Sequence, residues 1–339
     1  MPVERETMTS YEGQNAQITR RRLTIAIAAA PIIPTAWAQG GPRRVAWFGA
    51  GKTGAPAAYL EAMRSGLRER GWEEGRNLAI TAFFCDGTPE DAERVARQMI
   101  AANPEVIVGH GPEIVVLHRL KPPGPVVFAQ SGDPTDIGLV QSFARPGGNF
   151  TGLSFMSLDL VGKRIEMLRE AASGVRRLAV LARPEHPGEH RERKVSEAVA
   201  LKLGMQVAYI PFRAPSELDA ALQSVVQQHC DALVAFPDAL MVSLGARIAA
   251  FALKAKIATV SGWSRFADSG FLMTYGPNQQ AAFRDMARLV DRILRGAKPS
   301  ELPVELPHIL ELVINARTAR ALGLAIPQSL LVRADRVIS

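Results

Sequence analysis

From residue 43 onward the sequence alternates short apolar runs with longer amphipathic segments. Runs that are apolar throughout are typical of parallel strands covered on both faces, whereas apolar residues three or four positions apart indicate helices. Strands are predicted in the first half at 45–48, 78–84, 106–108 and 126–128. Tyr59, Met63, Gly66 and Leu67 have helical spacing and Gly71 ends that helix, and a second helix is predicted over 89–102.

The same alternation starts again after a predicted helix at 158–171. Five further strands are predicted at 178–181, 207–210, 233–236, 257–260 and 271–275, and each is followed by a helical stretch or a loop. This pattern predicts an α/β protein with parallel sheets in both halves.

Three glycine- and proline-rich breaks divide the two rounds. The segment 150–154, which follows the first break, is interpreted as a crossing between lobes, and a second crossing is placed at 276–277. The helix 279–294 would return to the first lobe, and a third break precedes a strand at 312–314. We therefore expect an N-terminal lobe of 42–153 plus 276–297 and a C-terminal lobe of 154–275 plus 298–339.

Two such Rossmann-like lobes would face each other across a ligand cleft. In open parallel sheets, ligands bind outside the carboxyl ends of the strands, where helix N-termini also offer free backbone N–H groups. The predicted fold therefore supports binding without any catalytic group.

Residues 1–38 are interpreted as a signal peptide. Three arginines at 20–22 precede a short apolar stretch, and Ala36-Trp37-Ala38 forms a small-x-small motif that predicts cleavage between Ala38 and Gln39. Residues 19–23 fit the twin-arginine pattern, although general secretion stays open, as does a translation start at Met8. Because no cysteine follows the predicted cleavage point closely, no stable membrane anchor is expected. These features predict a periplasmic protein.

Composition narrows the function further. The formal charge of +7 comes from scattered basic residues and not from a dense basic stripe, and export excludes most roles with nucleic acid. Two cysteines, Cys85 and Cys230, are too few for a disulfide framework and are expected to be unpaired thiols.

Two runs in the middle of the chain carry a specific resemblance to a known family. The run at 131–140 reads Ser-Gly-Asp-Pro-Thr-Asp-Ile-Gly-Leu-Val, and the run at 144–152 reads Ala-Arg-Pro-Gly-Gly-Asn-Phe-Thr-Gly. With the segments at 270–276, 312–315 and 330–335, these runs resemble the ABC-type substrate-binding proteins of the tryptophan/tyrosine-type transport family. The resemblance implies a type I periplasmic-binding-protein-like fold, a small-molecule solute, and ABC permease and ATPase subunits as partners of a monomer.

Three residues lie in stretches that match the family: Asp133, Ser154 and Tyr275. The resemblance implies that these positions belong to loops around the solute. The chain departs from the family pattern after two strands, at His110-Gly111-Pro112-Glu113 and at Arg183-Pro184. Both departures fall where solute would be contacted, which argues against carrying over an aromatic amino acid as the ligand.

The glycines of the first turn allow two interpretations. Gly49, Gly51 and Gly54 match the dinucleotide fingerprint, which gives an exported NAD(P)-dependent oxidoreductase as the alternative function. Asp86, however, lies farther along than the ribose-binding acid of that fingerprint. We therefore favour a glycine turn that gives solute access to the backbone around Gly51 and Thr53, with no cofactor.

Several charged residues are candidates near the cleft. Glu113, Asp133 and Asp238 follow strand ends, where each carboxylate could hold a ligand ammonium or cap the next helix. The segment 183–190 holds His186 and His190, and a solvated loop is favoured there over a metal site.

The candidate ligand-binding set is completed by loop residues at strand ends and comprises Gly51, Thr53, Gly111, Pro112, Glu113, Ser131, Asp133, Ser154, Arg183, Asp238 and Tyr275. No pairing of Ser or Cys with His stands out at the loop ends, so no catalytic residue is assigned and the protein is not expected to be an enzyme. Within the set, Asp133 and Tyr275 are predicted to line one cleft from opposite sides and to hold the solute jointly.

Overall fold

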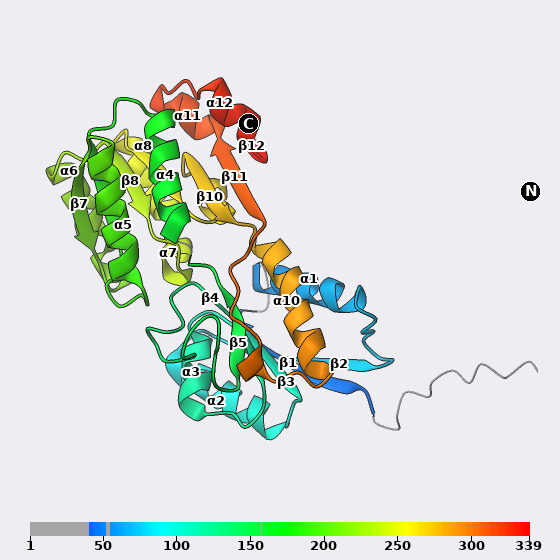
Figure 1. The fold of residues 1–339 in the computed structure, drawn as a ribbon. Coiled ribbons are helices and arrows are strands. Elements are labelled where there is room, and N and C mark those ends of the chain that lie inside the picture. Colours follow the sequence, from blue (N-terminus) through cyan, green and yellow to red (C-terminus); the bar gives the residue numbers. More distant parts are fainter. Residues whose placement is uncertain (1–40, 52–54, 157) are drawn as a thin grey trace, which may run out of the picture. The chain divides into compact units, whose positions relative to one another are not determined.

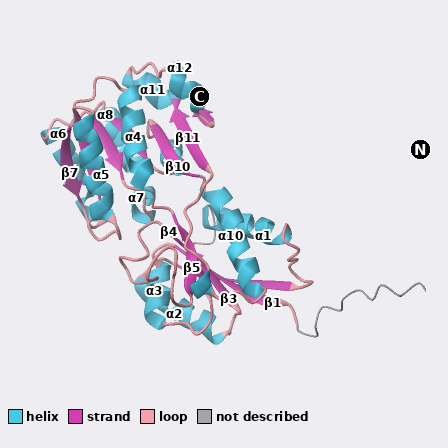
Figure 2. Ribbon diagram, in the orientation of Figure 1, coloured by secondary structure: helices cyan, strands magenta, loops and turns pink. Residues whose placement is uncertain are grey.

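The computed structural model describes residues 41–51, 55–156 and 158–339. Within these ranges the strands form two separate sheets, shown in Figures 1 and 2. The predicted signal peptide with its cleavage point at Ala38 and Gln39 lies outside the described residues, as do Thr53 and Gly54.

The first sheet has five parallel strands in the order β2-β1-β3-β4-β5. Their bounds are β1 Arg43–Ala50, β2 Leu78–Cys85, β3 Val106–His110, β4 Val126–Gln130 and β5 Phe150–Ser154. Alternate residues of β1 contact opposite layers: Val45 and Trp47 pack with one core cluster, and Ala46 and Phe48 pack with another. Both faces of the strand are therefore buried, which explains why its sequence is apolar throughout.

The second sheet has seven strands in the order β12-β11-β10-β9-β8-β6-β7. Their bounds are β6 Arg177–Ala182, β7 Gln206–Pro211, β8 Ala232–Ala235, β9 Ala258–Ser261, β10 Met273–Pro277, β11 Leu310–Asn315 and β12 Arg336–Ile338. All neighbours are parallel except β10 and β11, which are antiparallel. The two sheets with their helices are called the N-lobe and the C-lobe below.

Helices cover both faces of each sheet. In the N-lobe these are α1 Ala55–Arg68, α2 Pro89–Ala101, α3 Glu113–Leu120 and α10 Gln279–Leu294. In the C-lobe these are α4 Leu158–Ala171, α5 Glu189–Lys202, α6 Leu218–Gln227, α7 Ala239–Ser243, α8 Gly245–Lys254, α9 Ser264–Asp268, α11 Ala316–Leu322 and α12 Gln328–Arg333. Helices α1 and α10, far apart in sequence, lie side by side on one face of the first sheet.

The contact between α1 and α10 depends on one glycine. A Cβ on Gly66 would lie 2.1 Å from the Arg284 carbonyl oxygen, so only glycine allows the two helices to approach this closely. The helix predicted at 279–294 matches α10. Asn278 caps this helix, and its side chain accepts a hydrogen bond from Ala281 N at 2.9 Å.

The chain passes between the sheets three times, after β5, after β10 and before β11. The prediction that residues 150–154 are only a crossing segment was wrong, because these residues form β5 and pair in parallel with β4. The flanking glycines and Asn149 obscured the strand, whose five residues are all buried. The residue boundaries predicted for the two lobes stay a prediction.

Candidate functional site

His110 stands at the carboxyl end of β3, inside a group of aromatic side chains. Its ring centroid lies 5.2 Å from that of Trp47, 6.0 Å from Tyr59 and 5.7 Å from Phe283. Burial lowers the pKa of His110 to about 4, so the imidazole is neutral near pH 7. Its Nε2 atom is buried and has no hydrogen-bond partner among the described residues.

The first glycine of the fingerprint makes room for this imidazole. A Cβ on Gly49 would lie 2.4 Å from His110 Nε2, so a larger residue would displace the ring. Gly51 has φ +80° in the turn after β1, a conformation that favours glycine. Local packing and turn geometry thus account for both glycines, and the dinucleotide interpretation gains no support here.

The aromatic side chains continue from the N-lobe to the C-lobe. The ring of Phe155 lies 6.1 Å from Phe283 and 6.1 Å from Trp263, which follows β9 of the second sheet. Tyr59 stacks on Phe283 with centroids 4.4 Å apart, and its hydroxyl donates to Gln279 Oε1 at 2.6 Å. We call Trp47, Tyr59, His110, Phe155, Trp263 and Phe283 the aromatic cluster. It joins the carboxyl ends of strands from both sheets.

The C-lobe buries charges at the corresponding place. Arg164 of α4 is 1% exposed, and its Nε donates to the Tyr275 carbonyl oxygen at 2.8 Å. Its Nη1 is buried and has no partner among the described residues. Burial lowers the pKa of Arg164, while Glu192 and Tyr275 oppose that change.

Glu192 lies on α5, the helix that packs against α4, and is 3% exposed. Burial raises its pKa to about 7, Arg164 lowers it, and Glu189 and Asp238 raise it further. Its Oε2 and the Oε1 of Glu189 are both buried without a hydrogen-bond partner among the described residues. Buried polar groups without partners are rare in native proteins and need an explanation.

Asp238 and Arg183 complete this group. Asp238 caps α7, because its Oδ1 accepts a hydrogen bond from Met241 N at 2.7 Å. Its Oδ2 lies 3.4 Å from Arg183 Nη1, while Arg183 Nε is buried without a partner among the described residues. We call Arg164, Arg183, Glu189, Glu192 and Asp238 the charged cluster.

Two loops bring the lobes into direct contact. Ser131 Oγ and His186 Nε2 are 2.9 Å apart, and Asp133 N donates to the Pro187 carbonyl oxygen at 3.2 Å. The carboxylates of Asp133 and Asp136 both form ion pairs with Arg191. The prediction of a solvated loop at 183–190 was therefore wrong for His186, which is half-buried, contacts Ser131 of the N-lobe and has a pKa that burial lowers.

The predicted pair of Asp133 and Tyr275 has other partners. The Asp133 carboxylate accepts hydrogen bonds from Thr135 N at 2.8 Å and from Thr135 Oγ1 at 2.6 Å, in addition to pairing with Arg191. This is a local turn and not a helix cap, because no helix follows Asp133 directly. Tyr275 packs against the C-lobe core, and its carbonyl oxygen accepts a hydrogen bond from Arg164 of α4. Their joint role stays a prediction.

The remaining candidates also lie at strand ends. Pro112 occupies the N-cap position of α3 after Gly111, and Glu113 is buried, which raises its pKa. A capping role for Glu113 is therefore wrong, since Pro112 holds that position. Ser154 is fully buried and its Oγ donates to the Gly132 carbonyl oxygen at 3.2 Å.

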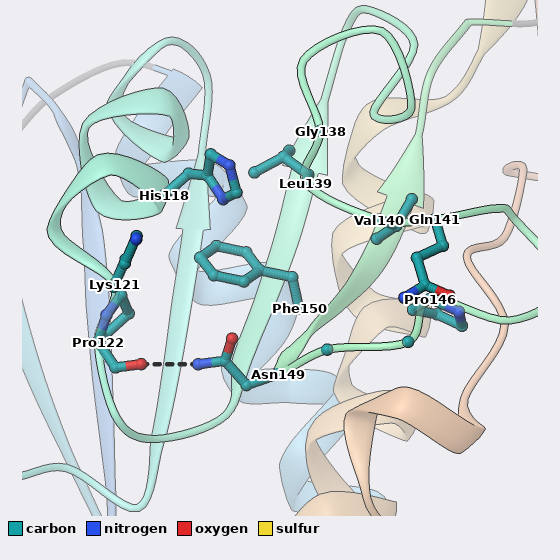
Figure 3. A pocket seen from close by; sticks show the side chains of 12 residues that line it. His118, Lys121, Pro122, Gly138, Leu139, Val140, Gln141, Pro146, Asn149 and Phe150 are labelled. Carbon is teal, nitrogen blue, oxygen red and sulfur yellow. Dashed lines mark hydrogen bonds between the residues drawn. The ribbon is translucent and has the colours of Figure 1, made fainter.

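Two concave regions lie in or beside the N-lobe, and they differ in their place relative to these loops. One of about 570 Å³ lies at the amino ends of β4 and β5, where Asn149 Nδ2 donates to the Pro122 carbonyl oxygen (Figure 3). Its lining includes His118, Lys121 and Phe150. A smaller one of about 270 Å³ is lined by Asp133, Phe143, Met156, Leu158, Asp159 and Leu306. The larger cavity lies at the other end of the sheet from the strand carboxyl ends. We therefore base the candidate site on the aromatic cluster and the charged cluster.

Sequence reasoning missed Arg164 and Glu192, although the pattern held a signal. In the helix 158–171, Arg164 stands in register with Val161, Ile165 and Leu168, so a charge interrupts an apolar stripe. Glu192 likewise stands in the buried stripe of α5 with Ser196 and Ala200. A charged residue inside a buried stripe is almost never left unpaired, and it marks a candidate for function.

The described ranges contain no group of three or more His, Cys, Asp or Glu side chains that could hold a metal ion. None of their helices is both long and apolar enough to span a membrane. Cys85 and Cys230 are both buried and free.

Comparison with known proteins places the fold and the family. A structure from Vibrio cholerae, described as a conserved domain protein, matches with TM-score 0.79 and 27% identity over 87% of this chain and 99% of its own. A Streptococcus pneumoniae ABC domain in complex with L-Trp matches with TM-score 0.80 and 21% identity over 88% and 100%.

A curated relative, the tyrosine-binding protein of Clostridioides difficile, is 22% identical over 76% of this chain and 74% of its own length. The family model described as ABC transporter substrate binding protein matches residues 55–338. The oxidoreductase alternative finds no support among these matches. The chain belongs to the family of ABC transporter substrate-binding proteins.

Proposed function

We propose that this protein captures an amino acid or a related small molecule outside the cytoplasm and delivers it to the permease and ATPase subunits of an ABC importer. Membership of the substrate-binding family supports solute capture for import. The names of two similar proteins, one a tyrosine-binding protein and one solved with L-Trp, support the amino acid class.

The observation that carries the proposal is the chemistry at the strand carboxyl ends. The aromatic cluster offers ring faces and edges around the neutral His110. The charged cluster offers guanidinium and carboxylate atoms that have no partner among the described residues. A small molecule with an apolar part and a charged part could contact both, and hinge closure of two lobes is the usual way to enclose it.

Native mass spectrometry of the mature protein, purified without added ligand, tests this function. A small solute that dissociates on mild activation is the expected result, and its mass identifies the compound. A bound dinucleotide would instead restore the oxidoreductase alternative. Absence of any bound compound, together with no thermal shift from a panel of amino acids and related acids, would contradict solute capture.

Export through a cleaved signal peptide is the second part of the proposal. N-terminal sequencing of the exported protein should begin at Gln39, and a start upstream of Arg20 would refute the cleavage. Changing Arg20 and Arg21 to Lys should block export if the twin-arginine route is used, whereas unchanged export would indicate general secretion.

We propose further that the mature protein is a periplasmic monomer, without a stable membrane anchor, when it meets its permease. Light scattering of the eluting protein should give the mass of one chain. A mass of two chains at micromolar concentration would contradict this part alone and leave solute capture intact.

A further inference from the structure

Arg164 has hydrogen-bonding capacity that the protein does not use. A guanidinium carries five N–H donors, and within the described residues Arg164 uses Nε, which donates to the Tyr275 carbonyl oxygen. Its Nη1 is buried without a partner in a side chain that is 1% exposed. A buried charged donor without a hydrogen bond lowers stability. Such a group is therefore expected where it serves a function.

Glu192 shows the complementary pattern. Its carboxylate is 3% exposed, and Oε2 is buried without a partner among the described residues. The two charges influence each other's pKa across the interface of α4 and α5, although their atoms do not approach to 4.0 Å as an ion pair would. A buried cation and a buried carboxylate thus stand close together without satisfying one another.

The guanidinium lies at the edge of the sheet where ligands bind. A Cβ on Gly262 would lie 2.7 Å from Arg164 Nη2 and 2.9 Å from Pro237 Cγ, so the group sits beneath the loops that follow β8 and β9. At Gly262 no side chain stands over the guanidinium. Asp238, which starts the next helix from the same loop, acts on the pKa of Glu192. The pair therefore belongs to the carboxyl edge of the C-lobe sheet.

We propose that Arg164 and Glu192 form the charged end of the solute site and select a small molecule that carries a carboxylate beside an amino group. This inference rests on the proposed function and specifies its substrate class. Arg164 Nη1 donates to the solute carboxylate, for which the guanidinium fork has the right geometry. Glu192 Oε2 accepts from the solute ammonium. Rings of the aromatic cluster contact the remaining part of the solute.

Matched probes on the wild-type mature protein test the substrate class without any mutation. The probes are L-tyrosine, L-tryptophan and L-leucine, each beside its carboxamide and its decarboxylated amine, with affinities from calorimetric titration. We expect the acid to bind about ten- to a hundredfold more tightly than its carboxamide, as for loss of one charge-assisted hydrogen-bonded contact. Carboxamides or amines that bind as tightly as the acids would overturn the proposal.

Variants then assign the effect to the two residues. Arg164→Met should abolish the preference for acid over carboxamide, Arg164→Lys should retain part of it, and Glu192→Gln should weaken binding of amino acids relative to their des-amino acids. Lys163→Met is the matched control, because it removes an exposed positive charge from the neighbouring position of the same helix. A preference that survives in both Arg164 variants, or is lost in the control, would overturn the assignment.

Two outcomes separate this inference from the function on which it rests. If none of the probes binds but the purified protein retains a solute, that solute must contain a carboxylate and an amine, and a neutral compound would overturn the inference while leaving solute capture in place. If Arg164→Met does not fold, the wild-type probe comparison and Arg164→Lys still decide. Absence of any solute and of any probe binding would overturn both proposals.

Discussion

Both lobes bury titratable side chains near the carboxyl ends of their strands, but the N-lobe buries a base among aromatic rings and the C-lobe buries an acid beside an arginine. In the N-lobe, His110 is neutral and lies among rings, with a pKa lowered by burial to about 4. In the C-lobe, burial raises the pKa of Glu192 to about 7, and Arg164 and Asp238 lie nearby. Burial favours the neutral form in both places, but it acts on a base in one and on an acid in the other. One architecture can therefore present different parts of a binding site on its two sides.

This difference predicts different consequences when one group is removed. Arg164→Met should lower the free energy of unfolding by about 3 kcal/mol, because it removes the hydrogen bond from a buried charged donor to the Tyr275 carbonyl oxygen and the positive charge that lowers the pKa of Glu192. Urea titration of the variant measures the loss.

A double-mutant cycle measures the coupling between Arg164 and Glu192. Glu192→Gln combined with Arg164→Met should lower the free energy of unfolding by clearly less than the sum of the two single changes. The glutamine is neutral, so removing Arg164 leaves no unpaired charge at position 192. Strict additivity would show that the two groups are not coupled and that the C-lobe is held by packing, as the N-lobe cluster is.

Stability should also depend on pH, and the direction of the change should differ between the two lobes. Between about pH 4.5 and 7 the folded protein holds a proton on Glu192 that the unfolded chain has lost, so this contribution to stability declines as pH rises. Between about pH 4 and 6.5 the unfolded chain protonates His110 while the folded protein does not, so that contribution declines as pH falls. Each effect reaches on the order of 3 kcal/mol.

Unfolding free energies measured from pH 4 to 8 test both signs. The difference between wild type and Glu192→Gln should shrink as pH rises, and the difference between wild type and His110→Gln should grow. Parallel curves for wild type and either variant would mean that the group does not titrate in that window.

Local patterns in the sequence predicted the architecture but not the partners of the site residues, and the reason is physical. Strand and helix placement depends on local periodicity, which is why the helices at 158–171 and 279–294 match α4 and α10. Partners depend on which residues the fold brings together. Asp133 stays a predicted solute contact, but no local pattern could show that Arg191, 58 positions away, pairs with its carboxylate.

The missed residues show the same limit. Arg164 is hidden inside a helix that the pattern treats as a cover for the sheet, and its neighbours Tyr275 and Gly262 lie about a hundred residues later. The spacing of apolar residues along the helix shows that Arg164 interrupts the apolar stripe, but it does not show which residues of other elements pack against that position. Strand-end positions such as Asp238 were found because a strand end can be read locally.

A smaller effect is expected at the hydroxyl group that borders the aromatic cluster. Tyr59→Phe removes the hydrogen bond to Gln279 Oε1 while keeping the ring that stacks on Phe283. The loss should be about 1 kcal/mol, typical of one intramolecular hydrogen bond. Urea titration with an unchanged slope would support this assignment. A loss above about 3 kcal/mol would mean that the hydroxyl, and not the ring, organises the cluster.

The smallest expected effect on stability lies where the two lobes touch. Arg191 of the C-lobe pairs with Asp133 and Asp136 of the N-lobe, and its side chain is 39% exposed. The Asp133 side chain is only 9% exposed, but the arginine end of the pair reaches solvent, so Arg191→Gln should change the free energy of unfolding by about 1 kcal/mol or less. Asp133 keeps its hydrogen bonds from Thr135 in the variant.

Solute affinity should respond differently from stability, because this ion pair joins parts that must separate when the lobes open. Arg191→Gln should weaken binding of the retained solute severalfold and make the affinity less sensitive to salt, since screening acts on the wild-type pair. Arg247→Gln is the matched control, because Arg247 pairs with Asp219 at 2.8 Å within the C-lobe and both side chains are exposed. Calorimetric titration at low and high salt measures both variants. Equal affinities in the two variants would show that the contact between the loops does not contribute to closure around the solute.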